Sequence, residues 1–309
     1  MRRLAFLATL VMGWPAHPAM AQQMDPTIRP ELIQQVTEHV HYIPDENRPL
    51  VPNVGFVVGS KAVLIIDTGL GQENGAIVLE AARGLSDTER FYVVASHTHP
   101  EHDLGAMAFP DDAAVIRSGH QEEDIEELGM SLADRFAEFS PRTAELLEGA
   151  AVRPSDIVFE DSLVVDLGGV TVHLINIGPA HTRGDLAIYV EPDNVLFTGD
   201  VVMNQYPMPL APNGSVQAWL NTLDRIEALD PAWVIPCHYD TGGVELIQNY
   251  RRFFATMHSR AVELRHAGSD DSTIADTLTE ETIPMFADWS DNGRIGASIA
   301  LVLRSMAVQ

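Results

Sequence analysis

Apolar residues in the first third of the chain occur in short runs bounded by turn residues, a pattern that predicts β-strands. The runs cover residues 39–44, 54–60, 62–68 and 91–96. Gly59, Ser60 and Lys61 are predicted to form a tight hairpin turn. Residues 73–85 instead repeat apolar positions at helical spacing. We therefore expect a β-rich beginning in which this helix joins the strands of 62–68 and 91–96 as a parallel pair.

The middle of the chain combines strands with an acidic helical segment. A short strand is predicted at 114–118, and the amphipathic residues 120–151 are expected to form two helices, separated near Ser140 and Pro141, as an insertion over one face of the domain. Residues 156–178 alternate apolar and polar positions in three stretches, which indicates half-buried antiparallel strands. Residues 186–192 and 194–200 are predicted to continue this second sheet.

The last third of the chain is mainly helical. Helices are expected at 216–229 and 244–268, with a strand at 233–236 between them and more helix after them. A β-rich block thus occurs twice, each time followed by helices. The pattern predicts an α/β protein of two mixed sheets packed together with helices outside, a four-layer αββα sandwich. No linker rich in Pro, Gly or Ser divides residues 22–309, so we expect one domain.

The first 21 residues have the pattern of a secretory signal peptide. A basic start is followed by an apolar run and by Ala19-Met20-Ala21, a small-residue ending that predicts cleavage before Gln22. A retained membrane anchor is the alternative, although the apolar run is short for a bilayer span. We therefore expect a periplasmic or secreted protein with no stable membrane anchor.

The charge of the chain limits its partners. The formal net charge is −25, which disfavours binding to nucleic acid and to anionic lipid, so a small-molecule substrate is expected. The single cysteine, Cys237, excludes an intramolecular disulfide and is interpreted as a small core residue. The sequence leaves the oligomeric state open.

The segment SHTHPEHDLGA at 96–106 concentrates chemistry at the end of a predicted strand. His97 and His99 are two apart, so they point to the same side of an extended chain. Pro100 suits the first turn of a new helix, which would carry Glu101 and His102. Imidazole and carboxylate groups at such short spacing are typical ligands for zinc and similar metals.

Three later polar residues also follow predicted strands. They are His181, Asp200 and His238. The ends of strands are places where connecting loops commonly build sites, and we expect these three to join the residues of 96–106.

These motifs resemble the H-x-H-x-D-H pattern, followed by His, Asp and His, of the metallo-β-lactamase-fold hydrolases, in particular their glyoxalase-II-like and quinoprotein-relay-like exported branch. The resemblance covers essentially all of residues 22–309. It implies one metal site formed by His97, His99 and His181. It implies a second site formed by Glu101, His102 and His238. Asp200 would bridge the two, and Asp67 would support the metal-binding loop from behind. Two zinc ions are the implied cofactor, with iron or manganese also compatible.

Glu101 departs from the family pattern, which has Asp at this position, and its extra methylene moves the carboxylate outward. Asp103 is interpreted as an acid that stabilises the first helical turn, in preference to a substitute ligand. Arg183 and Tyr239 flank ligand positions and are candidate substrate contacts. Six further histidines after the predicted signal peptide are interpreted as ordinary surface residues: His39, His41, His120, His173, His258 and His266. Residues 203–214 form either a lip over the metals or buried packing.

The resemblance implies hydrolysis of an ester, thioester, lactone or lactam by a metal-activated water, in which Glu101 and Asp200 would be catalytic. A metallo-β-lactamase that degrades β-lactam antibiotics is one alternative, although that branch usually has Cys or Ser in the place of Asp200. A mono-iron protein similar to persulfide dioxygenases, or an accessory protein of a quinoprotein or sulfur-oxidation system, is the other alternative.

Overall fold

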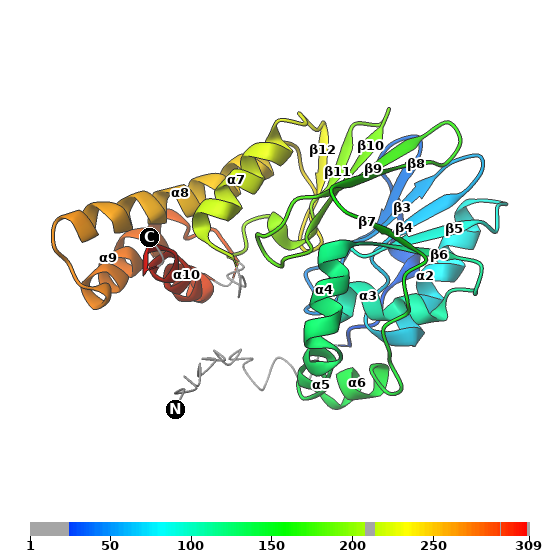
Figure 1. The fold of residues 1–309 in the computed structure, drawn as a ribbon, viewed down its shortest axis with the longest axis horizontal. Helices are drawn as coiled ribbons and strands as arrows, with labels where there is room; N and C mark the ends of the chain where they lie inside the picture. The colour runs from blue at the N-terminus through cyan, green and yellow to red at the C-terminus, as the bar shows by residue number, and fades with distance from the viewer. Residues whose placement is uncertain (1–24, 208–213, 291, 308–309) are drawn as a thin grey trace, which may run out of the picture.

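Two β-sheets pack face to face, with helices on their outer faces (Figure 1). The computed structural model describes residues 25–207, 214–290 and 292–307. The predicted signal segment, and six of the residues predicted to form a lip or packed loop, lie outside the described residues. The arrangement confirms the predicted α/β sandwich of two mixed sheets.

The first sheet has seven strands in sequence order, from β1 to β7. These are β1 (Gln34–Gln35), β2 (Val40–Ile43), β3 (Val54–Val58), β4 (Val63–Ile66), β5 (Phe91–Val94), β6 (Ala114–Ser118) and β7 (Ile157–Phe159). Strands β1 to β4 pair antiparallel and strands β4 to β7 pair parallel. The predicted turn is present, because Gly59 N donates to the Ala62 carbonyl at 3.0 Å. Helix α2 (Gly71–Leu85) makes the predicted parallel connection from β4 to β5.

The second sheet has five strands in the order β12-β11-β10-β9-β8. These are β8 (Ser162–Asp166), β9 (Thr171–Asn176), β10 (Leu186–Glu191), β11 (Val195–Phe197) and β12 (Trp233–Ile235). Strands β8 to β11 are antiparallel, and β12 joins β11 in parallel.

Strand β7 lies in the first sheet, whereas the alternation of its residues predicted a place in the second. Residues 157–159 were expected to be antiparallel in the second sheet, whereas β7 pairs parallel with β6 in the first sheet, with Ile116 opposite Ile157. The alternation of apolar and polar residues identifies a half-buried strand but not its neighbour. The long helical insertion serves as the crossover that a parallel pair requires.

Three helices, rather than the expected two, form this insertion. They are α4 (Gly119–Leu128), α5 (Ser131–Ala137) and α6 (Pro141–Leu146). The break near Ser140 is present, because its hydroxyl accepts a hydrogen bond from Thr143 N. The additional break follows α4 at Gly129, whose positive φ of 51° ends the helix.

Apolar side chains fill the three interfaces between the layers. Val57, Leu64 and Ile66 of the first sheet face Leu174 and Ile188 of the second sheet in one buried cluster. Helix α2 covers the outer face of the first sheet with Val78, Leu79 and Ala82. Helices α7 (Val216–Glu227) and α8 (Glu245–His266) cover the second sheet. This packing holds the loops at one edge of both sheets in a fixed relation.

The chain continues beyond the sandwich as α9 (Asp271–Met285) and α10 (Ile295–Ala307), which pack with α8 at one end of the molecule (Figure 1). An aromatic cluster lies in this end, including Phe253, Phe286 and Trp289. Among the described helices, none combines the length and the apolar character that crossing a membrane requires.

Candidate metal centre

The loop that follows β5 brings four candidate ligands to the edge of the first sheet. Strand β5 ends at Val94, and the backbone is extended again at His99, which precedes helix α3 (Pro100–Asp103). Pro100 occupies the start of this short helix, as predicted. His97 and His102 are fully buried and Glu101 is nearly so, while His99 is half-buried. The local sequence thus directs its polar groups into the protein.

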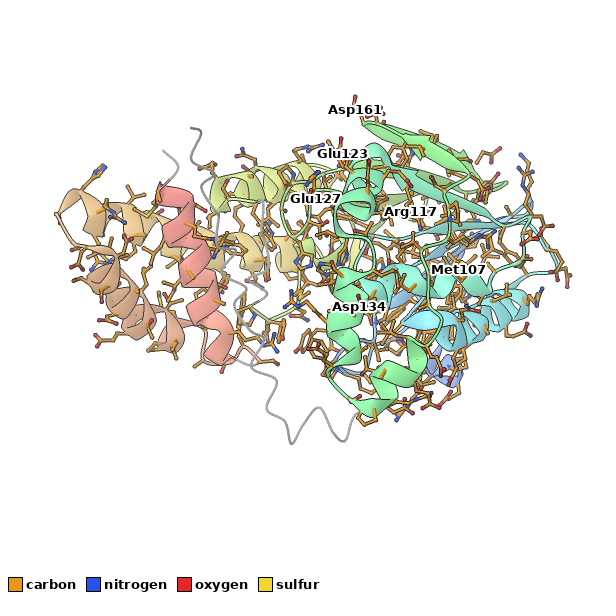
Figure 2. The ribbon with its side chains drawn as sticks, turned by 60° about the horizontal axis from the view of Figure 1, so that its bottom comes forward. Met107, Arg117, Glu123, Glu127, Asp134 and Asp161 are labelled. Carbon is orange, nitrogen blue, oxygen red and sulfur yellow. The ribbon has the colours of Figure 1, made fainter. Side chains whose placement is uncertain are left out.

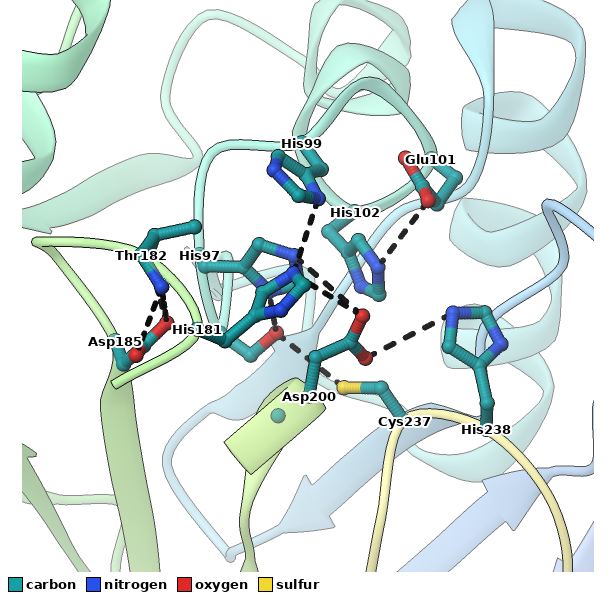
Figure 3. Close-up of polar contacts among 12 residues, drawn as sticks. His97, His99, Glu101, His102, His181, Thr182, Asp185, Asp200, Cys237 and His238 are labelled. Carbon is teal, nitrogen blue, oxygen red and sulfur yellow. Dashed lines mark hydrogen bonds and ion pairs between the residues drawn. The ribbon is translucent and has the colours of Figure 1, made fainter. Parts of the chain in front are cut away.

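His97, His99, His181 and Asp200 form the first cluster (Figure 3). One donor atom from each lies within 4.8 Å of those of the others. His181 Nε2 is 3.3 Å from His99 Nδ1 and 3.4 Å from Asp200 Oδ2. His97 Nε2 is 3.9 Å from the same carboxylate oxygen. The structure therefore brings together residues that are up to about a hundred positions apart in the sequence.

Glu101, His102 and His238 form the second cluster, in which the donor atoms again lie within 4.8 Å of one another. His102 Nε2 is 3.8 Å from Glu101 Oε1. His238 Nε2 is 3.8 Å from Asp200 Oδ1. Asp200 thus directs Oδ2 to the first cluster and Oδ1 to the second (Figure 3).

Several donor atoms of the two clusters fit a metal site. Within the described residues, His97 Nε2, His102 Nε2, Glu101 Oε2 and Asp200 Oδ1 are buried and have no hydrogen-bond partner. Buried polar groups are costly when they are left unsatisfied. Nitrogen and oxygen donors in this number and proximity suit zinc and similar divalent ions, which would satisfy them.

The pKa values of the histidines differ between the clusters. Burial, together with the neighbouring imidazoles, lowers the pKa of His97 well below its usual value and that of His99 to about 3. Burial also opposes the charged form of His102, but the carboxylates of Asp67, Glu101 and Asp200 outweigh it and raise that pKa to about 9. Burial raises the pKa of Glu101 and of Asp200. Burial therefore favours the neutral imidazole of His97 and of His99, whereas the surrounding carboxylates favour the charged form of His102.

Asp67 lies behind His102, at the position expected from the family resemblance. Its carboxylate accepts hydrogen bonds from Ser96 N at 2.7 Å and from the Ser96 hydroxyl at 3.1 Å. His102 Nδ1 is 3.0 Å away. Cys237 is buried, and its thiol donates to Asp67 Oδ2 at 2.9 Å, so its side chain has a specific polar partner. Asp67 thus connects the loop after β5 to the loop that carries His238.

Asp45 supports the second cluster in a way that the sequence did not reveal. Its Oδ2 atom is 3.7 Å from His238 Nδ1 and accepts a hydrogen bond from Tyr239 N at 3.0 Å. Asp45 belongs to an irregular segment between β2 and β3, with no ligand near it in sequence. Only the folded arrangement places it beside His238.

Asp103 has a partner other than a metal. Both of its carboxylate oxygens accept hydrogen bonds from Arg117 Nη2, at 2.8 and 2.9 Å, and both residues are buried. Arg117 also donates to the Arg153 carbonyl at 2.6 Å. Asp103 therefore joins the metal-binding loop to strand β6, beyond the first-turn role expected from sequence.

The two candidate substrate contacts stay predictions. Arg183 lies two positions after His181, and its guanidinium forms ion pairs with Glu123, Asp124 and Glu127 of α4. Tyr239 has a positive φ of 70°, and its ring stacks on that of Tyr206 at 4.6 Å.

Six other histidines of the described residues lie outside both clusters. His39 pairs with Asp193 at 2.7 Å, and His120 and His173 contact nearby carboxylates. His41 is half-buried on β2, and His258 and His266 belong to α8. No group of potential ligands found among the described residues includes any of these six.

The fold and the two ligand clusters together define a metal-dependent hydrolase. A family model described as the metallo-beta-lactamase superfamily matches residues 47–238. The chain belongs to this superfamily, which confirms the resemblance seen in its motifs; the branch within it is not resolved.

Two curated relatives show what the sequence is similar to. The acyl-coenzyme A thioesterase MBLAC2 of Homo sapiens is 28% identical over 220 residues, which are 64% of this chain and 78% of that protein. A type 2 metallo-beta-lactamase of Bacteroides fragilis is 31% identical over 98 residues, 30% of this chain and 39% of that enzyme.

Two solved structures share the fold. The metallo-beta-lactamase from Pontibacter korlensis has a TM-score of 0.57 and 16% identity, over 72% of this chain and 98% of that one. The sec-alkylsulfatase Pisa1 from Pseudomonas sp. has a TM-score of 0.60 and 18% identity, over 79% of this chain and 44% of the sulfatase. This chain therefore spans less than half the length of that sulfatase.

Proposed function

We propose that this protein hydrolyses a thioester with two zinc ions, one in each ligand cluster. The observation that carries this proposal is the position of Asp200, whose two carboxylate oxygens face different clusters. A carboxylate in that position can hold two ions close together, as a dinuclear hydrolase requires. The similarity to acyl-coenzyme A thioesterases over 220 residues supports a thioester as the bond that is cleaved.

The residues of the chain would divide the work as follows. When bound, the two ions would supply a water of lowered pKa and would polarise the substrate carbonyl. Asp200 fixes the separation of the clusters. Asp67 and Asp45 hold the imidazoles of His102 and His238 so that each Nε2 atom faces inward. Glu101 is buried beside this centre and is placed to orient the water or to accept its proton.

The charge of the chain supports a thioester whose thiol portion carries little negative charge. The net charge of −25 repels polyanions at long range. Helix α4, which contacts the loop of His181, carries Glu123, Asp124 and Glu127, whose negative charges Arg183 offsets only in part. Coenzyme A has several phosphate charges, which this surface would repel. A thioester of a smaller, neutral thiol would therefore bind better.

A substrate panel with purified protein tests the proposal. We would measure the metal content and then the hydrolysis of an S-acyl-N-acetylcysteamine, an acyl-coenzyme A, a lactone, nitrocefin and an alkyl sulfate. We expect about two zinc ions per chain and the highest kcat/KM for a thioester. A chelator should abolish the activity, and added zinc should restore it. Faster turnover of nitrocefin would favour the β-lactamase alternative. One iron per chain with oxygen uptake would overturn the hydrolytic proposal.

The same panel tests the inference from charge. At low ionic strength we expect kcat/KM for the N-acetylcysteamine thioester to exceed that for the coenzyme A thioester by about tenfold. Added salt screens the repulsion, so the difference should narrow as ionic strength rises. A preference for acyl-coenzyme A at low salt would contradict the charge argument while leaving the thioesterase proposal intact.

A further inference from the structure

Helix α4 contacts both loops that carry the histidines of the first cluster. Gln121 Nε2 donates to the carbonyl of Ala95 at 2.9 Å, two positions before His97. Gly184 N, three positions after His181, donates to Asp124 Oδ2 at 3.3 Å. One helix of the insertion therefore spans two loops that are more than eighty residues apart in sequence.

Gln121 is a rigid point of this contact. Its side chain is fully buried, and its Oε1 atom accepts a hydrogen bond from Ser118 N at 3.0 Å. Its own backbone N donates to the Ser118 hydroxyl, which completes a capping box at the start of α4. A Cβ atom at Gly184 would lie 2.8 Å from Gln121 N, so only glycine allows the loop to approach the helix this closely.

Arg183 adds an ion-pair cluster to the same contact. Its guanidinium lies 3.4 Å from Glu123 and 3.3 Å from Asp124, and it also pairs with Glu127. Glu123 and Glu127 lie on α4 (Figure 2). Without the guanidinium, three carboxylates would remain close together and would repel one another. Arg183 therefore offsets part of the negative charge on the helix surface that faces the His181 loop.

The loop of His181 is bonded internally beside this contact. Asp185 accepts a hydrogen bond from Ala180 N at 3.1 Å. It also accepts one from Thr182 N at 2.9 Å (Figure 3). The Thr182 hydroxyl donates to the same carboxylate at 2.6 Å. His181 lies between the bonded residues, so a displacement of Arg183 and Gly184 is transmitted to its imidazole.

We propose that the α4 contact, formed by Gln121 and Asp124 with Arg183 and Gly184, positions His181 against His97 and His99. Arg183 is a positioning residue in this account: its charge fixes α4 against the loop, and α4 sets the separation of the first-cluster ligands. This inference rests on the metal centre of the proposed function but not on which bond is cleaved. It gives the acidic insertion a role in metal binding.

The test compares Arg183→Met with Arg142→Met. Arg142 also pairs with three carboxylates, those of Asp25, Glu73 and Glu145, and its side chain is 27% exposed against 28% for Arg183. It belongs to α6 of the same insertion, and among the described residues its side-chain partners, Asp25, Thr27, Glu73 and Glu145, lie outside both histidine loops. It therefore reports what the loss of a similar ion-pair cluster does to stability alone.

We expect Arg183→Met to weaken binding of the first zinc ion about tenfold, measured by competition with a chromophoric chelator. The absorption of cobalt in the first cluster should change with it. Arg183→Lys, which keeps the charge, should recover part of the affinity. Arg142→Met should lower the unfolding midpoint by about as much as Arg183→Met does. It should leave both zinc affinities at the wild-type values.

Hydrogen exchange of metal-free protein separates this inference from the proposed function. Arg183→Met should speed amide exchange in residues 178–185 and 95–99, whether or not the wild-type protein binds zinc. If Arg183→Met shows the same amide exchange as wild type in these residues, the inference is overturned. The same holds if Arg183→Met binds the first zinc ion with wild-type affinity. If the wild-type protein binds no metal, the proposed function is overturned. The comparison of amide exchange between wild type and Arg183→Met would still test whether α4 positions the His181 loop.

Discussion

Carboxylates lie behind both histidines of the second cluster, whereas the first cluster depends on the loops that carry its histidines. Asp67 contacts His102 at 3.0 Å and Asp45 lies 3.7 Å from His238. In the first cluster, His97 Nδ1 faces the Ser96 hydroxyl at 3.1 Å. Charged carboxylates thus contact the ligands of the second cluster from behind, whereas a neutral hydroxyl contacts His97 of the first cluster. Substitutions should therefore separate the two clusters.

The largest effect is expected where the clusters meet. Asp200→Asn removes the negative charge that faces both clusters, so we expect zinc content to fall and kcat/KM to drop by about 10²- to 10³-fold. Asp193→Asn is the control, because Asp193 pairs with His39 away from the centre. Full zinc content in Asp200→Asn would show that the clusters do not share this residue.

A large effect on stability, but not on metal binding, is expected at Asp103. Asp103→Asn leaves the buried guanidinium of Arg117 with the carboxylate of Glu122, 3.7 Å away, as its remaining charged partner, so the free energy of unfolding should fall by about 3 kcal/mol in a urea titration. Asp166→Asn, which breaks an exposed pair with Lys61, should change it little. Loss of a metal ion from folded Asp103→Asn, with unchanged stability, would identify Asp103 as a ligand.

The carboxylates behind the second cluster should affect that cluster first. Asp67→Asn removes the charged partner of His102, and we expect the affinity for the second zinc ion to fall about 10- to 100-fold. The first ion should lose less, because Asp67 contacts His102 directly and reaches His97 of the first cluster through the Ser96 hydroxyl. Chelator competition with the two ions resolved would check this order, and a greater loss at the first ion would refute it.

The smallest effect is expected at the residue that departs from the family pattern. The Glu101 carboxylate already lies 3.8 Å from His102 Nε2, so its longer side chain reaches the cluster from this backbone position. Glu101→Asp should withdraw the carboxylate and weaken the second ion by less than about tenfold, with the first unchanged. Tighter binding would mean that Glu101 is a poorer ligand than the Asp usual in the family.

The sequence predicted best what depends on local spacing. His97, His99, Glu101 and His102 lie within six positions, and the strand and helix around them follow from apolar runs and one proline. The sequence was less informative where a distant partner decides the structure. Strand β7 lies in the first sheet because it pairs with β6. Asp45 lies beside His238 because of the path of an irregular segment, which the sequence did not predict.

The role of Arg183 shows the same limit in a different form. Its position beside His181 suggested a substrate contact, since sequence reveals which residues flank a ligand. That contact stays a prediction. The structure adds carboxylates of α4 around the guanidinium, which lie about sixty positions earlier in the chain and which the sequence did not indicate as partners. The sequence indicated that the insertion is acidic, but not that its helix α4 contacts the loop of His181.

The most direct test of the central claim is a crystal structure of zinc-loaded protein with anomalous scattering measured on both sides of the zinc absorption edge. The account predicts two zinc peaks. One should lie among His97, His99 and His181, the other among Glu101, His102 and His238, with Asp200 between them. A single peak, or two peaks that Asp200 does not contact, would contradict a shared dinuclear centre.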